Sequence, residues 1–106
     1  MFVEFVTTNG YQEQVESALT NNKIQTTLLK DFLEKLKGKR IANNIGEVKD
    51  ALEKLIINKL GETLWESSGL SIIKLPNKSN VFQLMIPGKR RKPLVVATFE
   101  TKRRPG

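Results

Sequence analysis

The sequence predicts a single α+β domain, spanning residues 1–106, in which helices pack on one face of an antiparallel sheet. The length of 106 residues suits one domain. Apolar residues recur at helical spacing through the first sixty residues, and the remainder is rich in β-branched residues and turn signals. Helices followed by a run of strands are typical of α+β proteins.

A strand and then helices are expected in the first sixty residues. Residues 2–6 place Glu4 among apolar neighbours, which predicts a strand, and residues 7–10 supply the turn that ends it. Apolar residues at i, i+3 and i+4 spacing then predict three helices, around residues 15–19, over 28–36 and over 48–60. We expect Gly38, as a left-handed cap, and Gly61 to end the second and third helices.

Three strands are expected after Trp65, where the apolar period changes. They run over residues 70–75, 81–86 and 94–101 and form an antiparallel meander. Pro87-Gly88 fits the centre of a type II turn. The last two strands therefore form a hairpin, whose ends lie roughly 20 Å apart because a strand rises about 3.3 Å per residue.

The distribution of charge indicates an acidic partner. Residues 1–66 hold nine Lys/Arg and ten Asp/Glu, a net charge of −1, whereas residues 67–106 hold nine Lys/Arg and only Glu100, a net charge of +8. Such asymmetry favours binding of a polyanion such as RNA or DNA. The alternative is solvated charge on exposed loops.

The expected hairpin divides the basic residues into two groups at its opposite ends. The group at the tip is Lys89, Arg90, Arg91 and Lys92. The group at the other end, where the 75–80 turn meets the tail after Thr101, is Lys74, Lys78, Lys102, Arg103 and Arg104. Both groups are expected to contact phosphates of a nucleic acid. The alternatives are a tip that only prevents edge-to-edge aggregation and a frayed basic tail.

The residues that are absent exclude several kinds of chemistry. The chain has no cysteine and no histidine, so it has neither a disulfide framework nor a thiolate or imidazole metal site, and no Ser-His or Cys-His dyad. Its acidic residues lack metal-loop spacing, so we expect no metal and no cofactor. The sequence shows neither a secretion signal nor an apolar run of membrane-spanning length, and a cytoplasmic location is expected.

The aromatic residues are expected to be structural. Phe82 and Phe99 lie in apolar strands and are predicted core residues, and Trp65 is expected to pack at the junction of helix and sheet rather than to stack on a base. Tyr11, the only tyrosine, is expected in the first helix.

The second half of the chain resembles the RelE/ParE superfamily of toxin–antitoxin systems, including its phage-derived HigB-like branch. The segment Lys59-Leu60-Gly61-Glu62-Thr63-Leu64-Trp65-Glu66 is similar to the "KLG…LWE" segment that precedes the sheet of that branch. The three strands that follow, and the ending Phe99-Glu100-Thr101-Lys102-Arg103, look like the family's consecutive strands with their basic end. The first half resembles the family only in the order and length of its elements.

This resemblance implies a metal-independent endoribonuclease that cleaves mRNA at the ribosome and is held by an antitoxin protein. In such enzymes basic side chains activate the ribose 2′-hydroxyl and stabilise the transition state. Lys74 matches a family lysine in the first strand of the meander and Arg103 the basic residue after the last strand, so Lys74, Lys102 and Arg103 are the expected catalytic residues.

Two departures from the family leave its activity open in this chain. Gln83 stands where the family usually has arginine, and the sequence lacks a segment carrying a catalytic tyrosine or histidine after the last strand. The alternatives are a ParE-like or phage-encoded inhibitor or adaptor, which binds a host protein or DNA without catalysis, and an accessory nucleic-acid-binding domain.

Overall fold

The computed structural model describes residues 2–8 and 13–104, with Phe2, Thr8 and Arg104 described by their backbone alone. Within these ranges the chain is α+β, as predicted, with four α-helices, two short 3-10 turns and five strands. The elements are β1 (Phe2–Thr8), α1 (Glu13–Asn21), α2 (Thr26–Lys35), β2 (Arg40–Ala42), a 3-10 turn (Ile45–Glu47), α3 (Val48–Leu60), α4 (Glu62–Ser68), β3 (Ser71–Lys74), β4 (Val81–Pro87), a second 3-10 turn (Lys89–Arg91) and β5 (Pro93–Arg104).

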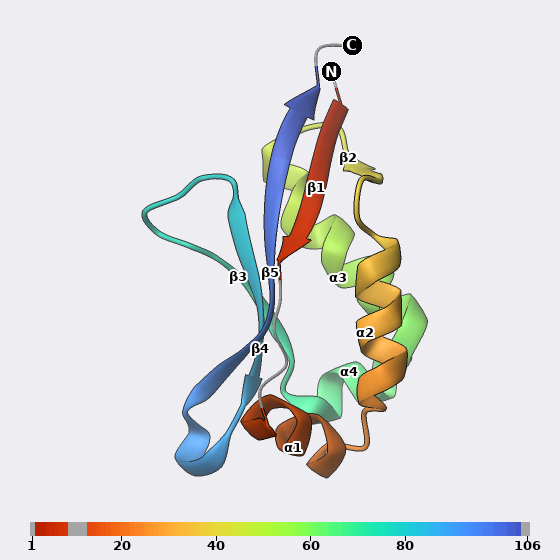
Figure 1. Ribbon diagram of the computed structural model, residues 1–106, viewed down its shortest axis with the longest axis vertical. Coiled ribbons are helices and arrows are strands. Elements are labelled where there is room, and N and C mark those ends of the chain that lie inside the picture. The colour runs from red at the N-terminus through yellow and green to blue at the C-terminus, as the bar shows by residue number, and fades with distance from the viewer. Residues whose placement is uncertain (1, 9–12, 105–106) are drawn as a thin grey trace.

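The five strands form one antiparallel sheet in the order β2-β1-β5-β4-β3. The expected meander is present as β3, β4 and β5. However, β1 pairs with the free side of β5, and β2 adds a further strand beside β1 (Figure 1). The expected three-stranded sheet is therefore part of a larger one, and β5 is its central strand.

The helices lie on one side of the sheet, and the core fills the space between them (Figure 1). The inner face of the sheet contributes Phe5, Phe82 and Phe99, all at most 2% exposed. Phe5 and Phe99 meet edge to face, with ring centroids 5.7 Å apart and an interplanar angle of 77°, a geometry that adds about 1 kcal/mol to their burial. The prediction of Phe82 and Phe99 as core residues is confirmed.

The predicted helices are confirmed as α1, α2 and α3. Their apolar stripes face the sheet because residues three and four apart share one side of a helix. Leu29 and Leu33 of α2, and Leu52 and Ile56 of α3, are completely buried. Gly61 ends α3, as expected, with a φ of +94° that residues other than glycine rarely adopt.

Two elements have no counterpart in the sequence-based prediction. The strand β2 has only three residues, too few for an alternating pattern to be visible. The helix α4 follows directly after Gly61, and the sequence pattern assigned no element to its seven residues. Both elements depend on their neighbours, since a helix of two turns and a strand of three residues are unstable alone.

The predicted turns needed correction at three places. The strand β1 continues to Thr8, and Thr7 is buried, with its hydroxyl donating to the Leu33 carbonyl at 3.4 Å. Asn9 and Gly10, the rest of that predicted turn, lie outside the described residues. Gly38 has a φ of +72°, but α2 ends at Lys35, and the Gly38 N–H donates to Phe5 of β1 instead.

The third correction concerns Pro87-Gly88. A type II turn needs a positive φ at its second central residue, whereas Gly88 is extended, with φ −101° and ψ −159°. Pro87 is the last residue of β4 and is opposite Pro93, so the turn comes later, within Lys89–Arg91.

Candidate nucleic-acid interface

The β4–β5 hairpin carries, at its two ends, most of the basic residues of the segment 67–106. Its register runs from Val81 opposite Glu100 to Pro87 opposite Pro93. Between Leu84, opposite Ala97, and Met85, opposite Val95, the register shifts by one residue, which leaves Val96 as the extra residue of a β-bulge. Val96 and Ala97 are both buried at this point. The predicted hairpin is confirmed.

The hairpin tip is a compact five-residue loop, closed by backbone hydrogen bonds. The Gly88 N–H donates to the Lys92 carbonyl at 2.8 Å, and the Arg91 N–H donates to the Gly88 carbonyl at 3.1 Å. We call its cations the tip cluster: Lys89, Arg90, Arg91 and Lys92, all exposed. Because the loop is closed on itself, the tip cluster is held at a fixed place at the end of the hairpin.

Two arginines of the tip cluster adopt a left-handed backbone conformation. Arg90 has a φ of +57° and Arg91 a φ of +61°. For residues other than glycine this conformation costs roughly 1–2 kcal/mol each. Glycine or asparagine adopts this conformation with less strain. The backbone geometry of the turn therefore does not by itself favour arginine at either position.

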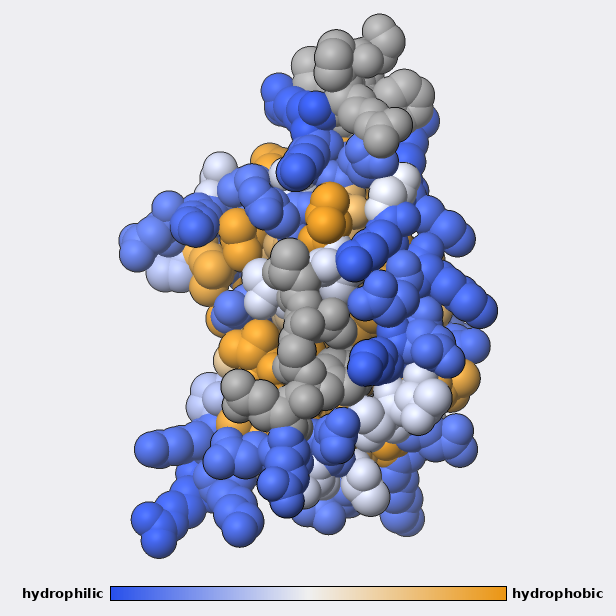
Figure 2. All heavy atoms as spheres, viewed as in Figure 1, coloured by the Kyte–Doolittle hydropathy of each residue, from blue (hydrophilic) through white to orange (hydrophobic). Residues whose placement is uncertain are grey.

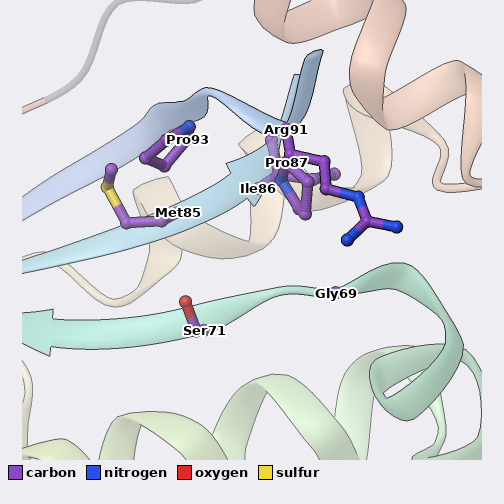
Figure 3. Close-up of a pocket in the computed structure, with 7 residues that line it drawn as sticks. All are labelled: Gly69, Ser71, Met85, Ile86, Pro87, Arg91 and Pro93. Carbon is purple, nitrogen blue, oxygen red and sulfur yellow. The ribbon is translucent and has the colours of Figure 1, made fainter. Parts of the chain in front are cut away.

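A shallow cavity of about 150 Å³ lies at the base of the tip, between β3 and the hairpin (Figure 3). Its lining is Gly69, Ser71, Met85, Ile86, Pro87, Arg91 and Pro93. Small-molecule sites usually measure several hundred Å³. The cavity is smaller than that, and the guanidinium of Arg91 extends away from the strands rather than across it (Figure 3). The tip therefore presents a convex basic surface.

The other end of the hairpin is joined to the β3–β4 loop through Asn80 and Thr101. The Thr101 N–H and hydroxyl both donate to the Asn80 carbonyl, at 2.9 and 3.4 Å, and the Asn80 side-chain amide donates to the Thr101 carbonyl at 3.3 Å. The 75–80 turn was expected to meet a tail after Thr101, but it meets Thr101 itself, and β5 continues to Arg104. Neither residue was singled out from the sequence, because uncharged side chains in a turn and a strand carry no distinctive signal.

Three exposed cations lie within two residues of this contact along the chain: Lys78, Lys102 and Arg103, which we call the strand-end cluster. Lys78 belongs to the β3–β4 loop, whereas the other two directly follow Thr101 in β5. Lys102 is opposite Glu4 and Arg103 is opposite Val3, whose side chain is buried in the core. Lys102 therefore points to the outer face of the sheet and Arg103 to the inner, helix-covered side. Arg104 belongs to β5, but its side chain lies outside the described part.

Lys74 is separated from the strand-end cluster by the register of the sheet. It is opposite Phe82, which is in turn opposite Phe99, so Lys74 is two strands away from β5. Arg103 lies four residues further along. These steps amount to about 16 Å between backbones in a flat sheet. The three expected catalytic residues, Lys74, Lys102 and Arg103, are therefore not brought together at one phosphate.

The outer face between the two clusters carries little charge. Ile73 and Val95 are exposed there, at 41% and 38%. Gln83 and Thr98 lie opposite each other, and the amide of Gln83 donates to the Thr98 hydroxyl at 3.5 Å. Figure 2 shows hydrophilic side chains over the hairpin tip at the lower left and apolar ones between the tip and the β3–β4 loop. Glu100 is the only acidic residue of the hairpin.

None of the aromatic side chains that the structure describes is placed to stack on a base at this surface. Phe5, Phe82 and Phe99 are buried. Phe32 and Trp65 are half-buried and pack against the core from the helical layer, as expected for Trp65. Tyr11 lies outside the described residues.

Within residues 2–8 and 13–104, no group of three or more acidic side chains is arranged to hold a metal ion. Nor does any helix in these ranges have the length and apolar character needed to cross a membrane.

Comparison with known proteins finds no matching model of a protein family, no matching curated protein and no matching solved structure. The resemblance to the RelE/ParE superfamily stays a prediction.

Proposed function

We propose that this chain binds nucleic acid, RNA in the first place, through the tip cluster and the strand-end cluster. The observation that carries the proposal is the arrangement of exposed cations at both ends of one hairpin. Within the described part of the chain, the side chains of both clusters form no ion pairs, so they are available to phosphates. Lysine and arginine that neutralise phosphates release condensed counterions, which drives binding at low salt.

The attachment of both clusters to regular structure supports the proposal. The tip cluster is held by the closed loop of the hairpin, and the strand-end cluster by the Asn80–Thr101 contact. Cations fixed by rigid elements lose less conformational entropy on binding than cations on a free tail. A frayed basic tail is not consistent with the structure at Lys102 and Arg103, because both residues of β5 are paired with residues of β1.

The proposal concerns binding rather than strand cleavage. Cleavage needs a base and charge-stabilising groups within hydrogen-bond reach of one ribose and its phosphate. Lys74, Lys102 and Arg103 lie on different faces or on strands that are not neighbours. In line with the RelE/ParE resemblance, the bound RNA belongs to the translation machinery and the chain acts as a toxin-like inhibitor whose partner is an antitoxin.

Fluorescence anisotropy with a labelled RNA and the purified protein tests the proposal. Lys89→Gln with Lys92→Gln, and Lys102→Gln with Arg103→Gln, each remove two cations from one cluster. Each double variant is expected to bind more weakly and to lower the slope of log K against log salt by roughly 1.4, since each phosphate contact on a single strand contributes about 0.7. Lys49→Gln with Lys54→Gln, two exposed lysines of α3, is the matched control and keeps the slope.

Two results would overturn the proposal. One is equal loss of affinity in the α3 control, which would mean that only the total charge matters. The other is no binding to RNA or DNA at low salt, which would leave an acidic host protein as the target.

The incubated RNA is expected to stay intact. Growth arrest on induction that Lys74→Ala with Arg103→Ala relieves, together with RNA cleavage, would instead favour the endoribonuclease.

A further inference from the structure

We infer that the nucleic acid bound at this surface is a duplex about one helical turn long, lying along the outer face of the sheet. This inference rests on the proposed function and adds the form of the ligand. Three observations carry it: the spacing of the two clusters, the lack of cations on the described outer face between them and the absence of exposed aromatic side chains among the described residues of that face.

The spacing follows from the length of β5. Ten residues separate Lys92 of the tip cluster from Lys102 of the strand-end cluster, but one of them is the extra residue of the bulge at Val96. About nine steps of 3.3 Å give roughly 30 Å along β5. The longest extent of the molecule is 42 Å, so the two clusters occupy its opposite ends (Figure 1). One turn of B-form DNA measures about 34 Å, which is close to this spacing, so a duplex of about one turn can contact both clusters.

The surface between the clusters fits a groove rather than a phosphate strand. Ile73, Val95 and the Gln83–Thr98 pair carry no charge. The phosphates of a single strand that followed the sheet would lie over this surface and would find no cation there. In a duplex the backbone turns away between its two contacts, and a groove with base edges and sugars lies there instead.

Proteins that bind single strands usually stack bases on exposed aromatic side chains. On the described outer face no aromatic side chain is exposed, because Phe5, Phe82 and Phe99 point into the core. The sheet therefore lacks the contacts that make single-strand binding favourable, whereas contacts to a duplex backbone need only cations at the right spacing.

The distribution of acidic residues selects the outer face over the helical side. The helices α1 and α4 contain exposed Glu13, Glu16, Glu62 and Glu66 and no cation. These carboxylates repel a polyanion from the surface of α1 and α4. On the outer face of the hairpin, Glu100 is the one acidic side chain between the clusters, and its cross-strand neighbours Val6 and Val81 are uncharged.

The test compares duplexes of 7 and 14 base pairs with a single strand of 14 nucleotides, each as RNA and as DNA. The 14-base-pair duplex is expected to bind at least about ten-fold more tightly than the 7-base-pair duplex, because only the longer one engages both clusters at once. Lys78→Gln with Lys102→Gln is expected to remove this length dependence. Glu100→Gln is expected to raise the affinity for the 14-base-pair duplex, and Glu66→Gln in α4, its matched control, to leave it unchanged.

The outcomes separate this inference from the proposed function. A single strand that binds as tightly as the 14-base-pair duplex, or equal affinities for the two duplex lengths, would overturn the inference and keep nucleic-acid binding. A preference for duplex DNA over duplex RNA would keep the inference and overturn RNA as the first target. Failure of every probe to bind at low salt would overturn both.

Discussion

Glu4 lies directly opposite Lys102 across the β1–β5 pair. The register places both on the outer face of the sheet, and on its other side Glu4 is the partner of Arg40 in β2. A carboxylate is thus held between two basic residues at the end of the sheet where the strand-end cluster lies. It lowers the positive potential at the same place where we propose that a phosphate binds.

Glu4→Gln is therefore expected to strengthen binding of nucleic acid. Removing the carboxylate removes its repulsion of a phosphate that binds near Lys102, and interactions between exposed charges are worth up to about 1 kcal/mol, or roughly five-fold in affinity. Asp31→Asn on the exposed side of α2 removes the same charge far from the cluster and is expected to change affinity less. Titrations of both variants at one salt concentration compare them, and equal gains would contradict a local effect.

The conformation of Arg90 allows charge and strain to be separated. Arg90→Gly and Arg90→Val remove the same cation and are expected to weaken binding equally. Their stabilities are expected to differ by about 1 kcal/mol or more in favour of glycine, because a β-branched residue fits a φ of +57° poorly. Urea unfolding and anisotropy on the same samples measure both quantities. Equal stability would show that the tip relaxes out of the left-handed conformation.

Gly69 and Pro87 are expected to be coupled in stability. Gly69 caps α4 with a φ of +78°, and a Cβ there would lie 2.9 Å from Cγ of Pro87. Gly69→Ala is expected to lower the free energy of unfolding by about 2 kcal/mol through strain and this contact. In a Pro87→Ala background the same change is expected to cost about 1 kcal/mol less. A double-mutant cycle measured by chemical unfolding gives the coupling, and additive effects would contradict the contact.

Asn80 is expected to hold the β3–β4 loop against β5. Asn80→Ala removes the amide that donates to the Thr101 carbonyl and is expected to cost about 1 kcal/mol. Asn77→Ala in the same loop is the control and is expected to stay within about 0.5 kcal/mol of the parent. Hydrogen exchange of the Thr101 amide, which bonds the Asn80 carbonyl, is expected to accelerate in Asn80→Ala alone. Unchanged exchange would show that the backbone bond holds the loop without the side chain.

Local patterns were sufficient to predict the long elements of this fold. The stripes of α2 and α3 and the hairpin strands β4 and β5 each repeat their pattern over enough residues to exclude other structures. The place of β1 between β2 and β5 could not be predicted, because pairing with β5 depends on residues almost a hundred positions away. The short elements β2 and α4 exist through tertiary contacts, which no local pattern records.

The candidate site was predicted in its composition but not in its geometry. The basic runs at 89–92 and 102–103 are visible in the sequence, and the hairpin places them at opposite ends as expected. The separation of Lys74 from Arg103 depends on register and on which strands are neighbours. The sequence alone does not determine either of these, since a shift of one residue exchanges the two faces of a strand.

The extra residue at Val96 has no partner in β4, and both it and its neighbour Ala97 are buried. Deleting Val96 would therefore keep every other pair of the hairpin, from Leu84 opposite Ala97 to Pro87 opposite Pro93, as a regular ladder. Because side chains alternate, Val95 would still face the solvent and Leu94 would still lie opposite Ile86. The bend and the added twist of the bulge would be lost instead, and with them the angle at which the hairpin presents the arginines of its turn. A single deletion in an apolar stretch thus acts on a charged surface that it does not touch.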